Sequence, residues 1–173
     1  MNHDAYDQSY ITGILGSVKT IAIVGASANE VRPSFFVMKY LIGKGFEVFP
    51  VNPGQAGKTI LGRMAYAKLA DIPVPIDMVD LFRASSAVPG IVDEVLALDP
   101  LPKVLWMQLT VRHDEAAARA EAAGISVVMN RCPKIEYARL AGEIGWSGVN
   151  SGIMSSKKPL MRSGFQSFGV RPR

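Results

Sequence analysis

The stretch Thr20-Ile21-Ala22-Ile23-Val24-Gly25-Ala26-Ser27, continued after a helical run by Val51-Asn52-Pro53, decides the fold of this chain. An apolar strand, a tight turn, a helix and a second strand form a βαβ unit, one half of a nucleotide-binding fold. Such a unit brings the strand ends and the helix N-terminus to one edge, where backbone N–H groups and the helix dipole favour a phosphate. We therefore expect a ligand that carries phosphates at this edge.

Apolar segments alternate with helical segments along the rest of the chain, which is typical of a parallel sheet covered on both faces. The predicted strands are 20–24, 46–51, 76–82, 103–109 and 126–129, and the predicted helices are 33–43, 87–98, 114–123 and 135–143. The predicted fold class is α/β, with a doubly wound, mostly parallel sheet of five or six strands in three layers. The glycine-rich segment 54–75 is expected to form a loop that folds over the ligand.

The composition indicates one compact domain with a tail. The chain has 173 residues, of which 49% are hydrophobic and 20% charged, enough for a substantial core. We predict a binding domain at 1–143, with its core at about 18–140, and a C-terminal extension with a basic tail at 144–173. The sequence shows neither a long apolar run nor a secretory signal, and Cys132 is its single cysteine, so we expect a cytoplasmic protein with no membrane partner.

The net charge of +4 comes from the tail. Five of the 19 basic residues follow the last acidic residue, Glu143, which leaves 14 basic residues against 15 acidic ones before it. These five are Lys157, Lys158, Arg162, Arg171 and Arg173. Because the body is close to neutral and no recognition motif accompanies the charge, we expect no nucleic-acid partner.

Several strand ends are predicted to meet around one crevice. The third strand should lie on the far side of the first, which places the reversal of strand order between them, and ligands of open α/β sheets bind at that point. The residues that follow the strands are Gly25-Ala26-Ser27, Asn52-Pro53, Phe82-Arg83, Gln108 and Asn130-Arg131-Cys132. Trp106 is expected in the core of the sheet rather than in the crevice.

The turn after the first strand suits a phosphate. Gly25 permits a sharp turn and a close approach of the ligand, while Ser27 could donate from its hydroxyl or cap the following helix. Pro33 fits the first turn of that helix, because a missing N–H costs nothing there. Arg32 offers a forked cation to a diphosphate. The alternatives are a plain strand-ending turn and a solvated arginine.

Other kinds of site are disfavoured by what the sequence lacks. The dinucleotide fingerprint needs further glycines, where Ser27 and Glu30 stand, and an acidic residue where the second strand ends in Asn52. His3 is placed in a loose N-terminus and His113 at a helix start, so both are interpreted as surface or capping residues, and no metal site is predicted. Cys132 could touch a ligand thiol, although a buried spectator is favoured.

Six motifs in order carry a resemblance to a known family. They are Val24-Gly25-Ala26-Ser27, Arg32-Pro33-Ser34, Val51-Asn52-Pro53, Ile76-Asp77-Met78-Val79-Asp80-Leu81-Phe82-Arg83, Val104-Leu105-Trp106-Met107-Gln108-Leu109 and Val127-Val128-Met129-Asn130-Arg131-Cys132. The chain resembles the small stand-alone coenzyme A-binding proteins, which are similar to the N-terminal domain of the succinyl-CoA ligase α subunit. The resemblance covers about 18–140, and 145–156 is similar to that family's C-terminal extension.

The resemblance implies a Rossmann-like fold that binds coenzyme A (CoA), with the ADP and pyrophosphate over the first turn and helix. The implied cofactor-binding residues are Gly25, Ala26, Ser27, Arg32, Pro33 and Ser34 on the phosphate side, Asn52 and Pro53 on the nucleotide side, and Phe82, Arg83 and Gln108 along the crevice. The ligase lysine that follows Pro-Gly is replaced by Gln55, and the next lysine is Lys58. Lys58 is included in the predicted site, and the group that meets the 3′-phosphate stays open. Thr110 stands where the family often has Gly.

The favoured hypothesis is a protein that binds CoA or an acyl-CoA without catalysing a reaction on it, as a carrier, sensor or regulatory module. The ligase domain with the phosphorylated histidine has no counterpart in this sequence, so ligase activity is not carried over and no catalytic residue is predicted. One alternative is an NAD(P)-dependent oxidoreductase with a variant Rossmann turn. Another is an interaction protein whose basic tail meets a partner that the sequence does not identify.

Overall fold

A computed structural model describes residues 2–142 of the chain, so the predicted C-terminal extension at 144–173 lies outside the described residues. Its central feature is a parallel sheet of five strands in the order β2-β1-β5-β6-β7. The strands are β1 (Thr20–Val24), β2 (Glu47–Val51), β5 (Met78–Leu81), β6 (Val104–Met107) and β7 (Ser126–Val128). The predicted doubly wound α/β fold is confirmed. The order reverses between β1 and β5, where the sequence analysis placed the crevice.

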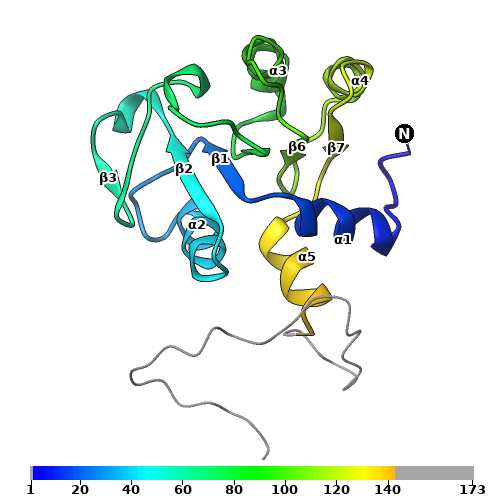
Figure 1. The fold of residues 1–173 in the computed structure, drawn as a ribbon, viewed down its shortest axis with the longest axis horizontal. Helices are drawn as coiled ribbons and strands as arrows, with labels where there is room; N and C mark the ends of the chain where they lie inside the picture. The colour runs from blue at the N-terminus through cyan, green and yellow to red at the C-terminus, as the bar shows by residue number, and fades with distance from the viewer. Residues whose placement is uncertain (1, 143–173) are drawn as a thin grey trace, which may run out of the picture.

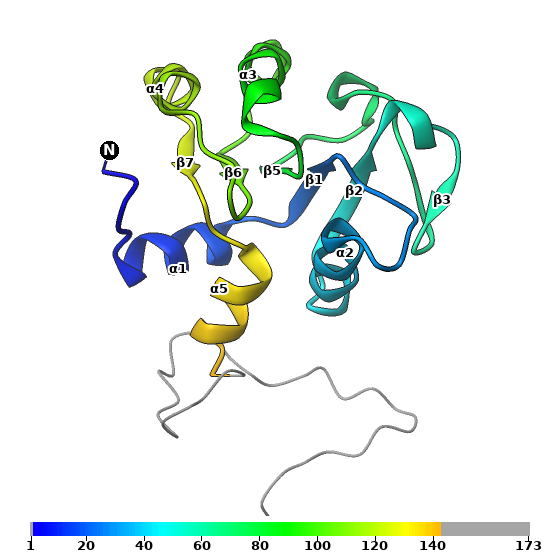
Figure 2. The same ribbon diagram turned by 180° about the vertical axis from the view of Figure 1, so that it is seen from behind.

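Helices cover both faces of this sheet and make three layers. Figures 1 and 2 show α3 (Val88–Leu96) and α4 (Asp114–Ala122) on one face, and α1 (Gln8–Ser17), α2 (Pro33–Gly43) and α5 (Pro133–Leu140) on the other. Short 3-10 turns lie at η1 (Pro53–Gln55), η2 (Leu69–Asp71) and η3 (Ser85–Ala87). Two helices differ from the predicted bounds by a few residues, because Pro133 begins α5 and the turn η3 precedes α3.

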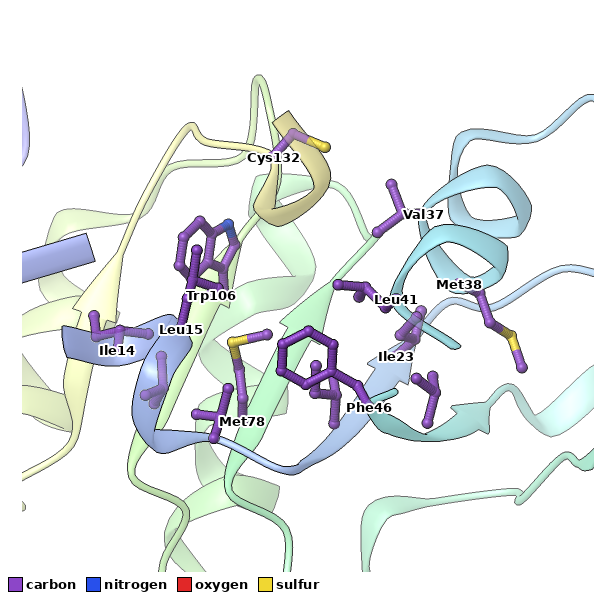
Figure 3. Close-up of a cluster of buried hydrophobic side chains, with 14 of the residues drawn as sticks. Ile14, Leu15, Ile23, Val37, Met38, Leu41, Phe46, Met78, Trp106 and Cys132 are labelled. Atoms are coloured by element: carbon purple, nitrogen blue, oxygen red, sulfur yellow. The ribbon is translucent and has the colours of Figure 1, made fainter. Parts of the chain in front are cut away.

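The core lies on both faces of the sheet, because the strands are apolar on both sides. Along each strand, successive side chains point to opposite faces of the sheet. Ile23, Met78 and Trp106 pack on the face covered by α1, α2 and α5 (Figure 3), and Val79 packs on the face covered by α3 and α4. Trp106 is fully buried, and its Nε1 donates a 2.7 Å hydrogen bond to the carbonyl oxygen of Arg131. The prediction that Trp106 belongs to the core is confirmed.

The helix α1 was not predicted from the sequence. It buries Ile11, Ile14 and Leu15, whose spacing of three and four residues puts them on one face. The prediction of a loose N-terminus around His3 is wrong, because that side chain is buried and its Nδ1 lies 2.8 Å from the hydroxyl of Tyr6. His3 is therefore a packed residue that anchors the segment before α1.

Two tyrosines of the N-terminal segment close the β7 edge of the sheet. The hydroxyl of Tyr6 accepts a 2.7 Å hydrogen bond from the backbone N–H of Met129, and the hydroxyl of Tyr10 donates a 3.2 Å hydrogen bond to the carbonyl of Val127. The two rings stack at 5.9 Å between centroids. Burial raises the pKa of both phenols, so the neutral hydroxyl that Tyr10 needs as a donor persists over a wider pH range.

The segment 54–75 lies beside the opposite edge of the sheet. It contains the antiparallel pair β3 (Thr59–Ile60) and β4 (Arg63–Met64). Tyr66 then pairs with β2, since its N–H donates to Pro50 and its carbonyl accepts from the N–H of Asn52, both at 2.9 Å. Backbone groups at the β2 edge thus hold part of this segment through an isolated bridge, and the expectation that the segment folds over the ligand stays a prediction.

Candidate functional site: a cleft at the carboxyl ends of the parallel strands

A cleft of about 700 Å³ lies at the reversal point of the sheet, between the start of α2, the ends of β1, β5 and β6, and the start of α5. It is lined by Gly25, Ser27, Arg32, Pro33, Ser34, Val37, Asn52, Phe82, Arg83, Ala84, Ser85, Gln108, Leu109, Thr110, Val111 and Cys132. Most of the site residues predicted from the sequence therefore line this one cleft. A smaller hollow of about 180 Å³ adjoins it, also in contact with Gly25, Asn52 and Arg83.

The turn after β1 brings the backbone to the cleft. Gly25 has φ +90°, in the left-handed region that favours glycine, and its N–H donates to the carbonyl of Val51 at 2.9 Å. Asn52 fixes the same turn from β2, since its Nδ2 donates a 2.7 Å hydrogen bond to the carbonyl of Ala26. The side chain of Ala26 is buried in the core, so this predicted residue supports the wall and does not line it.

The loop between β1 and α2 shapes the wall further. The Oγ of Ser27 accepts a 3.1 Å hydrogen bond from the N–H of Asn29, so Ser27 stabilises the turn before the helix and does not cap the helix itself. The N-cap of α2 is Arg32, which makes no side-chain capping bond, and Pro33 occupies the first turn as predicted. The N-terminus of an 11-residue helix thus borders the cleft without a side-chain cap.

The charge on the cleft wall is positive. Arg32 and Arg83 line it from the start of α2 and the end of β5, and neither has an ion-pair partner among residues 2–142. Among residues 2–142, no Asp or Glu lines the cleft. Two forked cations beside a helix N-terminus suit a ligand with more than one negative charge.

A buried carboxyl lies beneath this wall. Asp80 of β5 is fully buried, and the Nε2 of Gln108 lies 3.0 Å from each of its oxygens. Burial raises the pKa of Asp80 to about 8, a rise that the hydrogen bond from Gln108 only partly opposes. No role for Asp80 was expected from the sequence. The pattern that could have indicated one is an acidic residue inside the apolar strand Met78-Val79-Asp80-Leu81.

Two loops at the far end of the cleft are bonded to each other. Thr110 follows β6 and Asn130 follows β7, and both are in the left-handed region, with φ +69° and φ +53°. The Oδ1 of Asn130 accepts a 2.8 Å hydrogen bond from the N–H of Thr110, and the N–H of Asn130 donates to Val111 at 3.2 Å. This connection holds Leu109, Thr110 and Val111 against the cleft.

Cys132 lies on the cleft wall at the N-cap of α5, across from Val37 of α2 (Figure 3). Its side chain is buried, and burial raises the pKa of the thiol. The neutral thiol is therefore the dominant form near pH 7, and it is a weaker nucleophile than a thiolate. Cys132 is a wall residue of the cleft.

Other predicted residues lie elsewhere. Pro53 lines the smaller hollow, whereas Lys58 is exposed just before β3 and lines neither cavity. His113 is the N-cap of α4 and its Nδ1 accepts a 3.2 Å hydrogen bond from the N–H of Ala116, so its capping role is confirmed.

The described part of the chain contains no set of three His, Cys, Asp or Glu that could hold a metal. Across residues 2–142, none of the helices has both the length and the apolar character to cross a membrane.

Comparisons with known proteins converge on one family. The family model described as CoA binding domain matches residues 19–138. The uncharacterized protein YneT of Bacillus subtilis is 37% identical over 128 residues, which cover 74% of this chain and 92% of YneT. The structure of cell-free ID.343 from Thermus thermophilus has a TM-score of 0.73 at 38% identity, and the match covers 78% of this chain and 98% of that one. The α subunit of ADP-forming acetate–CoA ligase I from Pyrococcus furiosus is 32% identical over 80 residues, which cover 44% of this chain and 17% of that subunit.

Proposed function

This chain belongs to the CoA-binding domain family, and from that premise we propose that its cleft binds coenzyme A or an acyl-CoA without catalysing a reaction on it. The observation that carries the proposal is the positive wall at the reversal point of the sheet. Arg32, Arg83 and the uncapped N-terminus of α2 converge there, and no carboxylate of the described residues lines the cleft. CoA presents a diphosphate and a 3′-phosphate to such a surface.

The order of the strands suggests how the ligand lies. The diphosphate is placed at the Gly25 turn, where the backbone is closest to the cleft. The adenosine then extends toward Asn52 and Pro53 at the end of β2, next to the smaller hollow. The pantetheine arm extends the other way, past Phe82 of β5 toward Gln108 of β6. The diphosphate thus meets a polar part of the cleft wall, and the pantetheine arm meets a more apolar part.

The residue types on the wall support binding over catalysis. In the part of the chain that the structure describes, the cleft is lined by neither His, Lys, Asp nor Glu, which are the side chains most often used as general acids or bases. Cys132 is the one thiol on the wall, and the raised pKa of that thiol weakens it as a nucleophile. A role as a carrier, sensor or regulatory module follows for a protein that holds CoA unchanged.

Binding of NAD gains no support from this site. An NAD site needs an acidic residue at the end of β2 to hold the ribose hydroxyls. Asn52 stands there, and its side chain is already bonded to the carbonyl of Ala26 and to the N–H of Gly54 at 3.0 Å.

The proposal is tested by identifying the small molecule that copurifies with the protein. After denaturation, mass spectrometry of the released fraction should detect CoA or an acyl-CoA, and calorimetry with added CoA should show saturable binding. Incubation with acetyl-CoA should leave its concentration unchanged, apart from its spontaneous hydrolysis. Release of NAD(P) together with no affinity for CoA would reject the proposal.

A further inference from the structure

The amide of Gln108 is held in one orientation by Asp80. The Nε2 of Gln108 lies 3.0 Å from both oxygens of the Asp80 side chain, so the nitrogen end of the amide faces Asp80. The carbonyl oxygen Oε1 of Gln108 is therefore directed away from Asp80. The contact joins adjacent strands of the sheet, since β5 and β6 pair with Asp80 opposite Trp106.

That carbonyl oxygen faces the cleft. Gln108 Oε1 accepts no hydrogen bond from any residue in 2–142, and in the same part of the chain no fully buried side-chain oxygen or nitrogen lacks a partner. Oε1 consequently reaches open space, and Gln108 lines the cleft. The side chain as a whole is only 5% exposed, so Oε1 is a hydrogen-bond acceptor at the floor of the cleft.

This acceptor lies on the side of the cleft assigned to the pantetheine arm. β6 is two strands away from β1, and neighbouring strands are about 4.8 Å apart, so Gln108 lies on the order of 10 Å from the Gly25 turn. Val37, Val111 and Cys132, which line the same cleft, are apolar or weakly polar, so Gln108 supplies an acceptor that these side chains do not.

We propose that Gln108, oriented by Asp80, selects CoA with a free thiol over CoA that carries an acyl group. The S–H of the free thiol donates to Oε1. A thioester has no hydrogen on sulfur, and its carbonyl oxygen would face another acceptor. This inference rests on the proposed function, and it narrows the ligand to unacylated CoA. Gln108 touches the ligand, and Asp80 is a positioning residue that acts through Gln108.

The test compares three ligands by calorimetry on the full chain: CoA, desulfo-CoA and acetyl-CoA. The two analogues both lack the S–H donor, but one is smaller than CoA and the other larger. A size effect would move their affinities in opposite directions, whereas loss of the donor weakens both. We expect both to bind about two- to tenfold more weakly than CoA, the range for one net hydrogen bond.

Two variants report on the pair itself. Asp80→Leu removes the partner of the Gln108 amide nitrogen, so the amide is no longer held in one orientation and the preference for CoA should shrink. The double variant Asp80→Leu with Gln108→Met replaces the buried pair by apolar side chains of similar size, a change that cores often tolerate. In this variant the affinities for CoA and desulfo-CoA should become equal.

Arg32→Ala is the matched control, because it lies at the diphosphate. It should weaken all three ligands by the same factor and leave their ratio unchanged. Equal affinity of the native chain for the three ligands, or a preference for CoA that survives in the double variant, would overturn the role of Gln108 while leaving CoA binding intact. Failure of all three ligands to bind would reject the proposed function, and the inference with it.

Discussion

The carbonyl oxygen of Phe82 lies only 2.5 Å from the position that a β-carbon on Gly25 would occupy. The turn after β1 and the end of β5 therefore approach each other more closely than any other residue type at position 25 allows. Gly45 provides a comparison, because its φ of +91° matches the +90° of Gly25 while nothing lies within 4 Å of its β-carbon position.

Replacing these two glycines by alanine should separate backbone strain from close approach. Gly25→Ala should lower the free energy of unfolding by about 1–3 kcal/mol more than Gly45→Ala does, because only the former adds a clash. Urea denaturation followed by circular dichroism measures both losses. Equal losses in the two variants would show that the contact with Phe82 relaxes at no cost.

Arg32 should contribute strongly to CoA affinity. Arg32→Ala removes a charged donor beside the diphosphate, and we expect CoA binding to weaken by about 1.5–3 kcal/mol, roughly ten- to a hundredfold. Lys39→Ala is the control, since Lys39 is an exposed cation on the same helix but does not line the cleft. Unchanged affinity after Arg32→Ala in calorimetry would mean that Arg32 is only a solvated surface residue.

Lys58 is the residue to test for contact with the 3′-phosphate. It is exposed and precedes β3 on the nucleotide side of the site, so any ion pair that it makes is screened by solvent. Lys58→Ala should weaken CoA by about two- to fivefold and leave dephospho-CoA, which lacks that phosphate, unaffected. A loss shared by both ligands would assign Lys58 to another part of the molecule, and no loss would remove it from the site.

The buried carboxyl of Asp80 should make stability depend on pH. Burial raises its pKa from 3.8 to about 8 in the folded chain, so between these values the folded state holds a proton that the unfolded state has lost. Stability should therefore fall as the pH rises through this window. Asp80→Asn removes the effect, and its advantage over the native chain should grow by up to about 1.4 kcal/mol per pH unit. Parallel unfolding curves for the two proteins from pH 4 to pH 8 would contradict this.

Thr110 has the backbone conformation of a glycine, with φ +69°. A β-branched residue is strained in this region, so Thr110→Gly should raise the free energy of unfolding by roughly 0.5–1 kcal/mol. Thr110→Ala keeps a β-carbon and should bring no comparable gain. Thermal unfolding of the two variants distinguishes strain at this backbone from an effect of the lost hydroxyl.

The sheet and the cleft could be predicted because strong local signals coincide there. Gly25 and Asn52 end apolar runs, and the carboxyl ends of parallel strands necessarily meet at one edge. The helix α1 escaped prediction because Gly13 and Gly16 lower its helix propensity, so its stability comes from packing against the sheet.

The contacts that complete the site depend on three-dimensional pairing that no local pattern encodes. The bond between Asp80 and Gln108 joins residues 28 positions apart, and it exists because β5 and β6 pair with Leu81 opposite Met107. The ladder between Pro50 and Tyr66 likewise depends on where segment 54–75 runs after its two short strands. Periodicity locates the strands, but only their register decides which side chains meet.

Neighbouring segments occupy backbone groups at both edge strands of the sheet, β2 and β7, and this limits how the folded chain can associate. Tyr6 and Tyr10 occupy backbone groups next to and within β7, while Tyr66 pairs with the outer side of β2, where Pro50 has no N–H to offer. Open ladders are the usual starting points for strand addition and amyloid-like polymerisation. With these positions taken, each edge offers fewer free backbone groups to a further strand, so edge-to-edge growth of the folded domain is disfavoured.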